Sequence, residues 1–162
     1  MRRFLLLLLI SALSLPALAQ GRLVGSSADK RPAWVKRDVD RYDVIKVSYE
    51  STLSLRDAED KAFESLRNHV VNTVTTYLMK YNVEGRSLED IRSDVENSGY
   101  VRDISGLTSI DTYWEHRTVK KQDVYIYYIL YDFNDFEKKK IAMEIDFDYL
   151  SPEGSITNFQ QP

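Results

Sequence analysis

Residues 54–78, SLRDAEDKAFESLRNHVVNTVTTYL, decide the fold. Apolar side chains recur in this stretch every three or four positions, which is the spacing of one face of an α-helix. Ser54 with Asp57 three residues later is typical of a helix N-cap. The apolar face consists of Leu55, Ala58, Ala62, Leu66, Val70, Val74 and Leu78, widened by Phe63, Val71 and Tyr77. The pattern predicts one long helix over about residues 55–80.

Alternating apolar and polar residues on both sides of this helix predict β-strands. In residues 43–50, Ile45, Val47 and Tyr49 share one side and Lys46 and Ser48 the other, as in a half-buried strand. Residues 109–116 and 123–131 alternate in the same way and are separated by a charged stretch, which predicts an antiparallel hairpin. We therefore expect an α+β fold in which an antiparallel sheet of three or more strands carries the long helix on one face.

Two further segments have helical features. Ser87 and Asp90 resemble a capping pair, Leu88, Ile91 and Val95 follow at helical spacing, and Gly99 is expected to stop this second helix. Residues 134–149 are ambiguous, because their apolar residues fit both a helix face and a strict alternation. Periodicity alone favours a strand, but a cap at Asn134 with Glu137 and the residues 140–144 fit a helix, and together with the family resemblance given below they favour a helix over 134–146.

The N-terminus has the features of a secretory signal. Two arginines precede an unbroken apolar run, and Ala17 and Ala19 form the small-x-small pattern of a cleavage site before Gln20. The alternative is an uncleaved anchor, but a membrane span needs about 20 apolar residues and polar residues interrupt this shorter run. We predict a signal peptide over residues 1–19 and a periplasmic or extracellular protein.

Composition limits what the mature protein can be. Its length suits a single domain, expected over residues 33–150 after a flexible lead-in at 20–32 and before a disordered tail at 151–162. The formal net charge is −3 for the whole chain, and removing the leader makes it more negative. An acidic protein is a poor partner for nucleic acid or anionic lipid. The chain has no cysteine, so disulfides and a lipidated cysteine are both ruled out.

Three features together resemble the lipoprotein-twenty-like family of bacterial envelope domains, which includes flagellar assembly-associated lipoproteins. They are Pro32-x-Trp34-Val35, the helix start Ser54-Leu-Arg-Asp-Ala58-Glu-Asp-Lys-Ala62, and the tyrosine-rich run Val124-Tyr-Ile-Tyr-Tyr-Ile-Leu130. The resemblance covers about residues 32–146 and implies a small α+β domain without catalytic residues. The sequence departs from the family in two respects: a glycine often found before the helix is absent, and so is the lipidated cysteine.

Residues suited to catalysis are few and scattered. His69 and His116 belong to no local metal-binding pattern, so no metal or other cofactor is predicted. No motif of a nucleophilic serine is present. Glu59 with Asp60, or Asp146 with Asp148, could serve as the two acids of a glycosidase, but only their abundance suggests it. The sequence therefore does not predict an enzyme.

The tyrosine-rich strand provides the candidate binding residues. Tyr125, Tyr127 and Tyr131 share one face with Ile129, and the opposite face, which we expect to be the core face, consists of Val124, Ile126, Tyr128 and Leu130. The tyrosines then form an exposed aromatic strip suited to protein or sugar contacts, with Trp34 as a further candidate. The alternative is that these rings only shield the second face of the sheet.

We accordingly expect a non-catalytic exported domain that binds an envelope protein or cell-surface component through a face or edge of its sheet, and that could form homo-oligomers. A hydrolase with an unrecognised carboxylate site and a carbohydrate-binding module using surface tyrosines are the alternatives. A concave pocket with two facing acids favours the hydrolase, a flat aromatic face favours binding, and an uncovered strand edge favours pairing with another protein.

Overall fold

The computed structural model describes residues 21–36, 43–80, 86–107 and 110–145. The predicted signal peptide with its cleavage residues Ala17, Ala19 and Gln20, the acid pair Asp146 and Asp148, and the predicted tail at 151–162 all lie outside these ranges. In the described part of the chain, no helix is long and apolar enough to cross a membrane.

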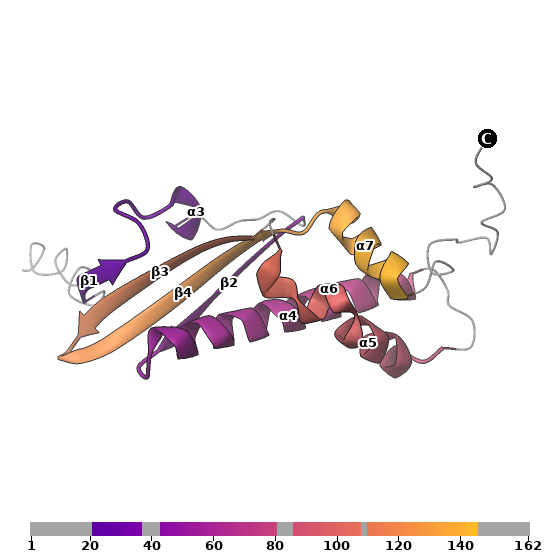
Figure 1. Cartoon of the computed structure of the whole chain (residues 1–162), viewed down its shortest axis with the longest axis horizontal. Coiled ribbons are helices and arrows are strands. Elements are labelled where there is room, and N and C mark those ends of the chain that lie inside the picture. Colours follow the sequence, from indigo (N-terminus) through magenta and orange to yellow (C-terminus); the bar gives the residue numbers. More distant parts are fainter. Residues whose placement is uncertain (1–20, 37–42, 81–85, 108–109, 146–162) are drawn as a thin grey trace, which may run out of the picture.

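A four-stranded antiparallel sheet forms the centre of the molecule (Figure 1). Its strands are β1 (Arg22–Ser26), β2 (Val44–Ser51), β3 (Ile110–Val119) and β4 (Gln122–Asp132), arranged in the order β1-β3-β4-β2. The long helix α4 (Leu55–Met79) packs against β2 and β4 on one face, below the sheet in Figure 1. The α+β class, the antiparallel sheet and the long helix on one face are confirmed.

Helix α4 begins where the sequence predicts. The side-chain oxygen of Ser54 accepts a hydrogen bond of 3.0 Å from the backbone N–H of Asp57, which satisfies one of the free donors at the helix start. The Asp57 carboxylate accepts a 2.6 Å bond from Ser51 Oγ and so ties the helix to the end of β2. Ala58, Ala62 and Leu66 are fully buried, as the apolar face predicts.

The predicted hairpin is present and longer than expected. β3 and β4 pair in continuous register from Ile110 with Tyr131 to Val119 with Gln122, and a two-residue turn joins them. Lys120 and Lys121 form that turn with φ angles of 51° and 69°. Positive φ at both central residues is the geometry of a type I′ turn, which matches the twist of the strands but usually takes Asn-Gly.

Short helices gather at one end of α4 (Figure 1). α5 (Leu88–Asn97) has the predicted capping box of Ser87 and Asp90. The expectation that Gly99 stops this helix is wrong, because Ser98 caps it and Gly99 starts the short helix α6 (Gly99–Arg102). A single 3-10 turn, η1 (Ile104–Gly106), follows.

The ambiguous C-terminal segment is a helix, α7 (Asp135–Ile145). Asn134 Oδ1 accepts hydrogen bonds from the backbone N–H groups of Phe136 and Glu137, as expected for its cap. The Glu144 carboxylate at the other end of α7 accepts hydrogen bonds from the N–H groups of Gly99 and Tyr100, and so caps α6. Helix α7 is therefore fastened to the domain by side-chain contacts.

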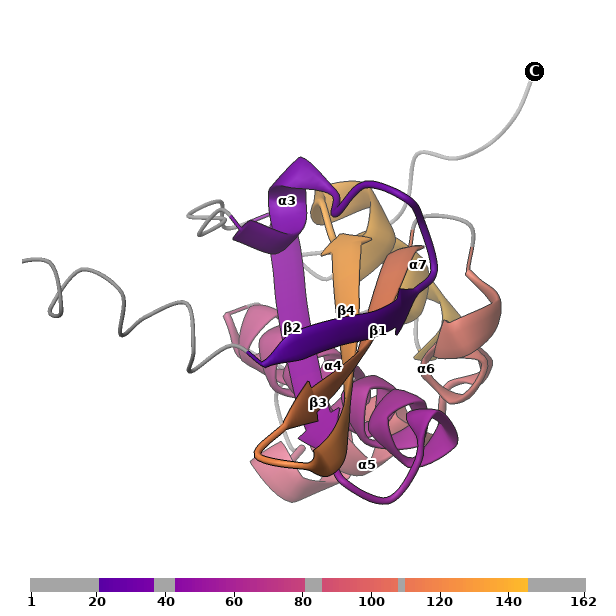
Figure 2. The ribbon, with the colours of Figure 1, turned by 90° about the vertical axis from the view of Figure 1, so that its left-hand side faces the viewer.

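The prediction that residues 20–32 form a flexible lead-in is wrong for most of that segment. Residues 22–26 form β1, which pairs antiparallel with β3 despite an irregularity between Leu23 and Gly25. Beyond β1 the chain crosses the sheet face opposite α4 and forms the short helix α3 (Ala33–Lys36) (Figure 2). Backbone pairing with β3 and an ion pair of Arg31 with the buried Glu115 hold this segment, although its sequence has little apolar periodicity.

Candidate functional site

The tyrosine strip is not exposed, and the two faces of β4 are the reverse of our expectation. Tyr127 and Tyr131 are 7% and 0% exposed. Together with Ile129 they belong to the core between the sheet and α4. The Tyr127 hydroxyl donates to Glu59 Oε1 at 3.0 Å, and the Tyr131 hydroxyl donates to Glu137 Oε2 at 3.3 Å. Tyr125 is half-buried and stacks on the His116 ring at 4.5 Å between centroids. These rings support the fold and offer no flat aromatic platform.

The opposite face of the sheet is covered by the N-terminal segment. Arg31 crosses it and donates to the Tyr128 hydroxyl at 2.9 Å. Lys46 on β2 donates to the backbone oxygen of Val35 in α3 at 3.0 Å. Trp34 lies half-buried in α3, a helix that lies on the side of the sheet opposite α4 (Figure 1). The structure therefore does not bring Trp34 together with Tyr127 and Tyr131.

A buried carboxylate organises this second face. Glu115 on β3 is 1% exposed and lies 2.9 Å from Arg31 Nε and 2.8 Å from Arg117 Nη2. Two arginines around one carboxylate compensate for the cost of burying its charge. Beside them an open cleft of about 290 Å³ is lined by Arg31, Glu50, Arg117, Val119, Val124, Ile126 and Tyr128. At Glu50 the cleft reaches β2, the strand at one edge of the sheet. Neither His69 nor His116 lines the cleft.

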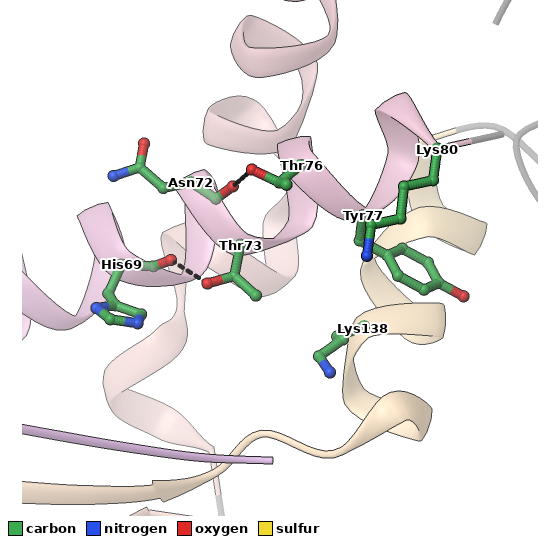
Figure 3. A pocket seen from close by; sticks show the side chains of 7 residues that line it. All are labelled: His69, Asn72, Thr73, Thr76, Tyr77, Lys80 and Lys138. Carbon is green, nitrogen blue, oxygen red and sulfur yellow. Dashed lines mark hydrogen bonds between the residues drawn. The ribbon is translucent and has the colours of Figure 1, made fainter. Parts of the chain in front are cut away.

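A second hollow lies between α4 and α7 (Figure 3). It has a volume of about 380 Å³ and is lined by His69, Asn72, Thr73, Thr76, Tyr77, Lys80 and Lys138. The hydroxyls of Thr73 and Thr76 both donate to backbone oxygens of α4, so neither is activated by the imidazole of His69. The Lys138 ammonium donates to Asp135 at 2.9 Å. The side chains that line this hollow are polar, and both of its threonine hydroxyls are bound to backbone oxygens.

Of the two acid pairs considered from the sequence, Glu59 and Asp60 lie within the described residues. Glu59 and Asp60 line a third hollow of about 600 Å³ with Phe63, Glu64, Arg67 and Ser105. Glu59 accepts from Tyr127, and Asp60 is largely exposed, 3.9 Å from Arg56. The carboxyl pKa values that shift clearly in the described chain are those of Glu64, Asp90, Asp135 and Glu137, and each is lowered by hydrogen bonds to its neighbours. A general acid requires a raised pKa, so these four are unsuited to that role.

Glu137 is the most constrained of these acids. Burial raises the pKa of its carboxyl, but hydrogen bonds from Tyr100, Lys140 and Tyr131 together with the Lys140 charge outweigh burial and hold the pKa below its ordinary value. The Lys140 ammonium donates to Glu137 Oε1 at 2.9 Å, and the Tyr100 hydroxyl donates to Oε2. The hydrogen bonds of this cluster link α6, α7 and β4 to one another.

The two histidines lie on different elements. His116 on β3 is 2.9 Å from Asp123 through Nε2, while His69 lines the groove on α4. Within the described ranges, no group of three or more His, Cys, Asp or Glu side chains is arranged to hold a metal ion.

The two edges of the described sheet differ sharply. β1 has five residues and an irregular register with β3. β2 has eight residues and pairs with β4 in unbroken register from Val44 with Asp132 to Ser51 with Tyr125. Its other side has no partner strand among the described residues. Such a row of backbone N–H and C=O groups is a template for another strand, and natural edges are normally short, bulged or covered.

The side chains of β2 are exposed toward this open edge. Ser48, Tyr49 and Glu50 are all exposed, and Tyr49 is 40% exposed although it belongs to the helix-covered face. Lys46, Ser48 and Glu50 share the opposite face, so opposite charges stand four residues apart on one side of the strand. The alternation of the segment predicted the strand but not its edge position, which depends on pairing elsewhere in the chain. In the sequence, the charges of Lys46 and Glu50 were the signal that could have indicated this edge position.

Comparison with known proteins gave no match to a protein-family model, a curated protein or a solved structure. The resemblance to the lipoprotein-twenty-like family stays a prediction.

Proposed function

We propose that this chain is a non-catalytic exported domain that acts by binding another protein at the open edge of β2. The observation that carries the proposal is the contrast between the two edges, since β1 is short and irregular whereas β2 is long, regular and exposed at Ser48, Tyr49 and Glu50. Backbone hydrogen bonds from an added strand supply affinity, and the alternating side chains supply specificity.

The proposal includes the predicted export and the envelope or cell-surface setting, which rest on the sequence of residues 1–20. The two alternative functions have less support. A carbohydrate-binding module based on surface tyrosines loses its platform because Tyr127 and Tyr131 are buried. For a hydrolase with a carboxylate site, none of the four clearly shifted carboxyls has the raised pKa of a general acid.

Photo-cross-linking in the native cell envelope tests the proposal. A photoreactive amino acid replaces exposed Ser48 in one variant and exposed Glu89 on α5 in a matched control. We expect covalent protein adducts of defined mass from position 48 and none from position 89. Equal labelling from both positions, or no adduct from position 48, would contradict binding at this edge.

A further inference from the structure

We propose that the strand added at this edge is β2 of a second copy of the same chain, paired antiparallel about a twofold axis through Ser48. Two four-stranded sheets then join into one continuous sheet. This inference rests on the proposed use of the β2 edge and names its partner. Its basis is that the edge is complementary to itself in charge and in the side chains that would meet across it.

The charges on β2 select the register. When Ser48 stands opposite Ser48 of the second copy, Lys46 stands opposite Glu50 and Glu50 opposite Lys46 of that copy. Directly opposed residues in antiparallel strands lie on the same face with their Cβ atoms about 5 Å apart, so both pairs are ionic contacts. Lys46 keeps its bond to Val35 O, because an ammonium has three donors. One interface therefore gains two identical ion pairs.

Other registers lose this match. Centring the axis on Lys46 or on Glu50 places like charges directly opposite each other, which is destabilising. Centring it on Val47 places Lys46 opposite Ser48, so that Lys46 and Glu50 no longer stand opposite each other across the interface. A pairing of Val47 with Ser48 would bring together residues from opposite faces, which the strict alternation of side chains forbids.

The helix-covered face also gains from the pairing. In the Ser48 register, the exposed ring of Tyr49 lies opposite Val47 of the second copy, and aromatic rings with β-branched side chains are favourable cross-strand pairs. A twofold axis normal to the sheet places both copies of α4 on the same side. The exposed aromatic residue of this edge is thereby covered without any change in the monomer fold.

Sedimentation analysis of the purified full chain over a concentration series tests the inference. We expect a concentration-dependent dimer that Glu50→Lys weakens about tenfold or more, because by symmetry one substitution creates two like-charge pairs. Asp111→Lys makes the same charge change at an exposed position of β3 away from the edge and should leave the dimer intact. The charge-swapped variant Lys46→Glu/Glu50→Lys should recover dimerisation, since it restores both ion pairs with reversed polarity.

A wild-type chain that stays monomeric throughout the series overturns the inference, as does a dimer that Glu50→Lys leaves unchanged. If position 48 then cross-links to a different protein, binding at the β2 edge stands and only the identity of the partner is wrong. If position 48 yields no adduct of either kind, both proposals fail. Circular dichroism of each variant checks that loss of the dimer is not loss of the fold.

Discussion

The Nε atom of Arg31 lies 2.9 Å from Oε1 of Glu115, a carboxylate that is buried in the face of the sheet opposite α4. No acceptor lies in hydrogen-bonding geometry about this nitrogen, so the contact is an ion pair. It joins the segment after β1 to the third strand, and Arg117 supplies a second cation to the same carboxylate. The N-terminal segment is thus held by charge as well as by backbone pairing.

Arg31→Ala should destabilise the domain by about 1–3 kcal/mol, the range for a lost bond to a charged group, and not by the larger cost of an unpaired buried charge, because Arg117 still compensates Glu115. Urea denaturation measures the change. Arg56→Ala is the matched control, since Arg56 is exposed and lies 3.9 Å from Asp60. Equal stability of the two variants would show that the Arg31 contact contributes nothing.

Ala62→Leu should destabilise the protein by about 1–3 kcal/mol, because Ala62 is fully buried where α4 meets the sheet and a larger side chain overpacks that contact. Thermal unfolding followed by circular dichroism provides the measurement. Glu64→Leu, on the solvent side of the same helix, serves as the control. An unchanged melting temperature for Ala62→Leu would mean that α4 presents another face to the sheet.

Tyr131→Ser should destabilise the domain by about 3–5 kcal/mol, because it removes a fully buried ring and the hydroxyl that donates to Glu137. Tyr49→Ser removes an exposed ring of the same kind and should have a much smaller effect on the monomer. Chemical denaturation at low protein concentration compares the two without interference from association. The reverse order of effects would restore the interpretation of Tyr131 as a surface residue.

Replacing the turn by Lys120→Asn/Lys121→Gly should stabilise the protein by about 1 kcal/mol, because both lysines hold the left-handed conformation that L residues adopt at a cost. Differential scanning calorimetry should show a raised melting temperature. Lys139→Asn on α7 removes an exposed lysine charge elsewhere and controls for electrostatics. A drop in stability would indicate that the two lysine side chains make contacts worth more than the strain.

Stability should fall in acid partly through Glu137. Its pKa is lower in the folded protein than its ordinary value near 4.5, so its contribution is fully present above that value and is lost as the pH falls through the lower native pKa. Melting temperatures measured from pH 7 to pH 3 should decline less steeply for Glu137→Gln than for the wild type. Tyr100→Phe, which removes one donor to the carboxylate, should give an intermediate slope.

Elements with strong local patterns were predictable from the sequence. The apolar face and the cap at Ser54 defined α4, and alternation defined the hairpin, because these signals depend on residues close together in the chain. β1 was missed since its five residues, Arg22–Ser26, have no alternation and depend on a partner far away in the sequence. The face of β4 was assigned wrongly because both of its faces are apolar; the buried Glu115 and its partner Arg31 lie on the face that α4 does not cover.

The candidate site was less predictable than the fold. Alternation placed Lys46 and Ser48 on the polar side of a strand, but strand order decides whether that strand is central or at an edge. Strand order follows from pairing between distant segments, and no local pattern encodes it. Tyr49 illustrates the difference: its position favours burial beneath α4, yet the missing neighbour among the described strands leaves it exposed.

The bond between Arg31 and Tyr128 spans 97 positions of the chain, and it bears on the order in which the protein folds. The entropic cost of closing so long a loop must be met before the contact contributes any stability. Such pairings therefore form slowly. β1 and Arg31 remain without their partners until β3 and β4 are in place. We therefore expect β1 to join the sheet after the hairpin of β3 and β4 has formed, so that closure of this long loop is a late step in folding.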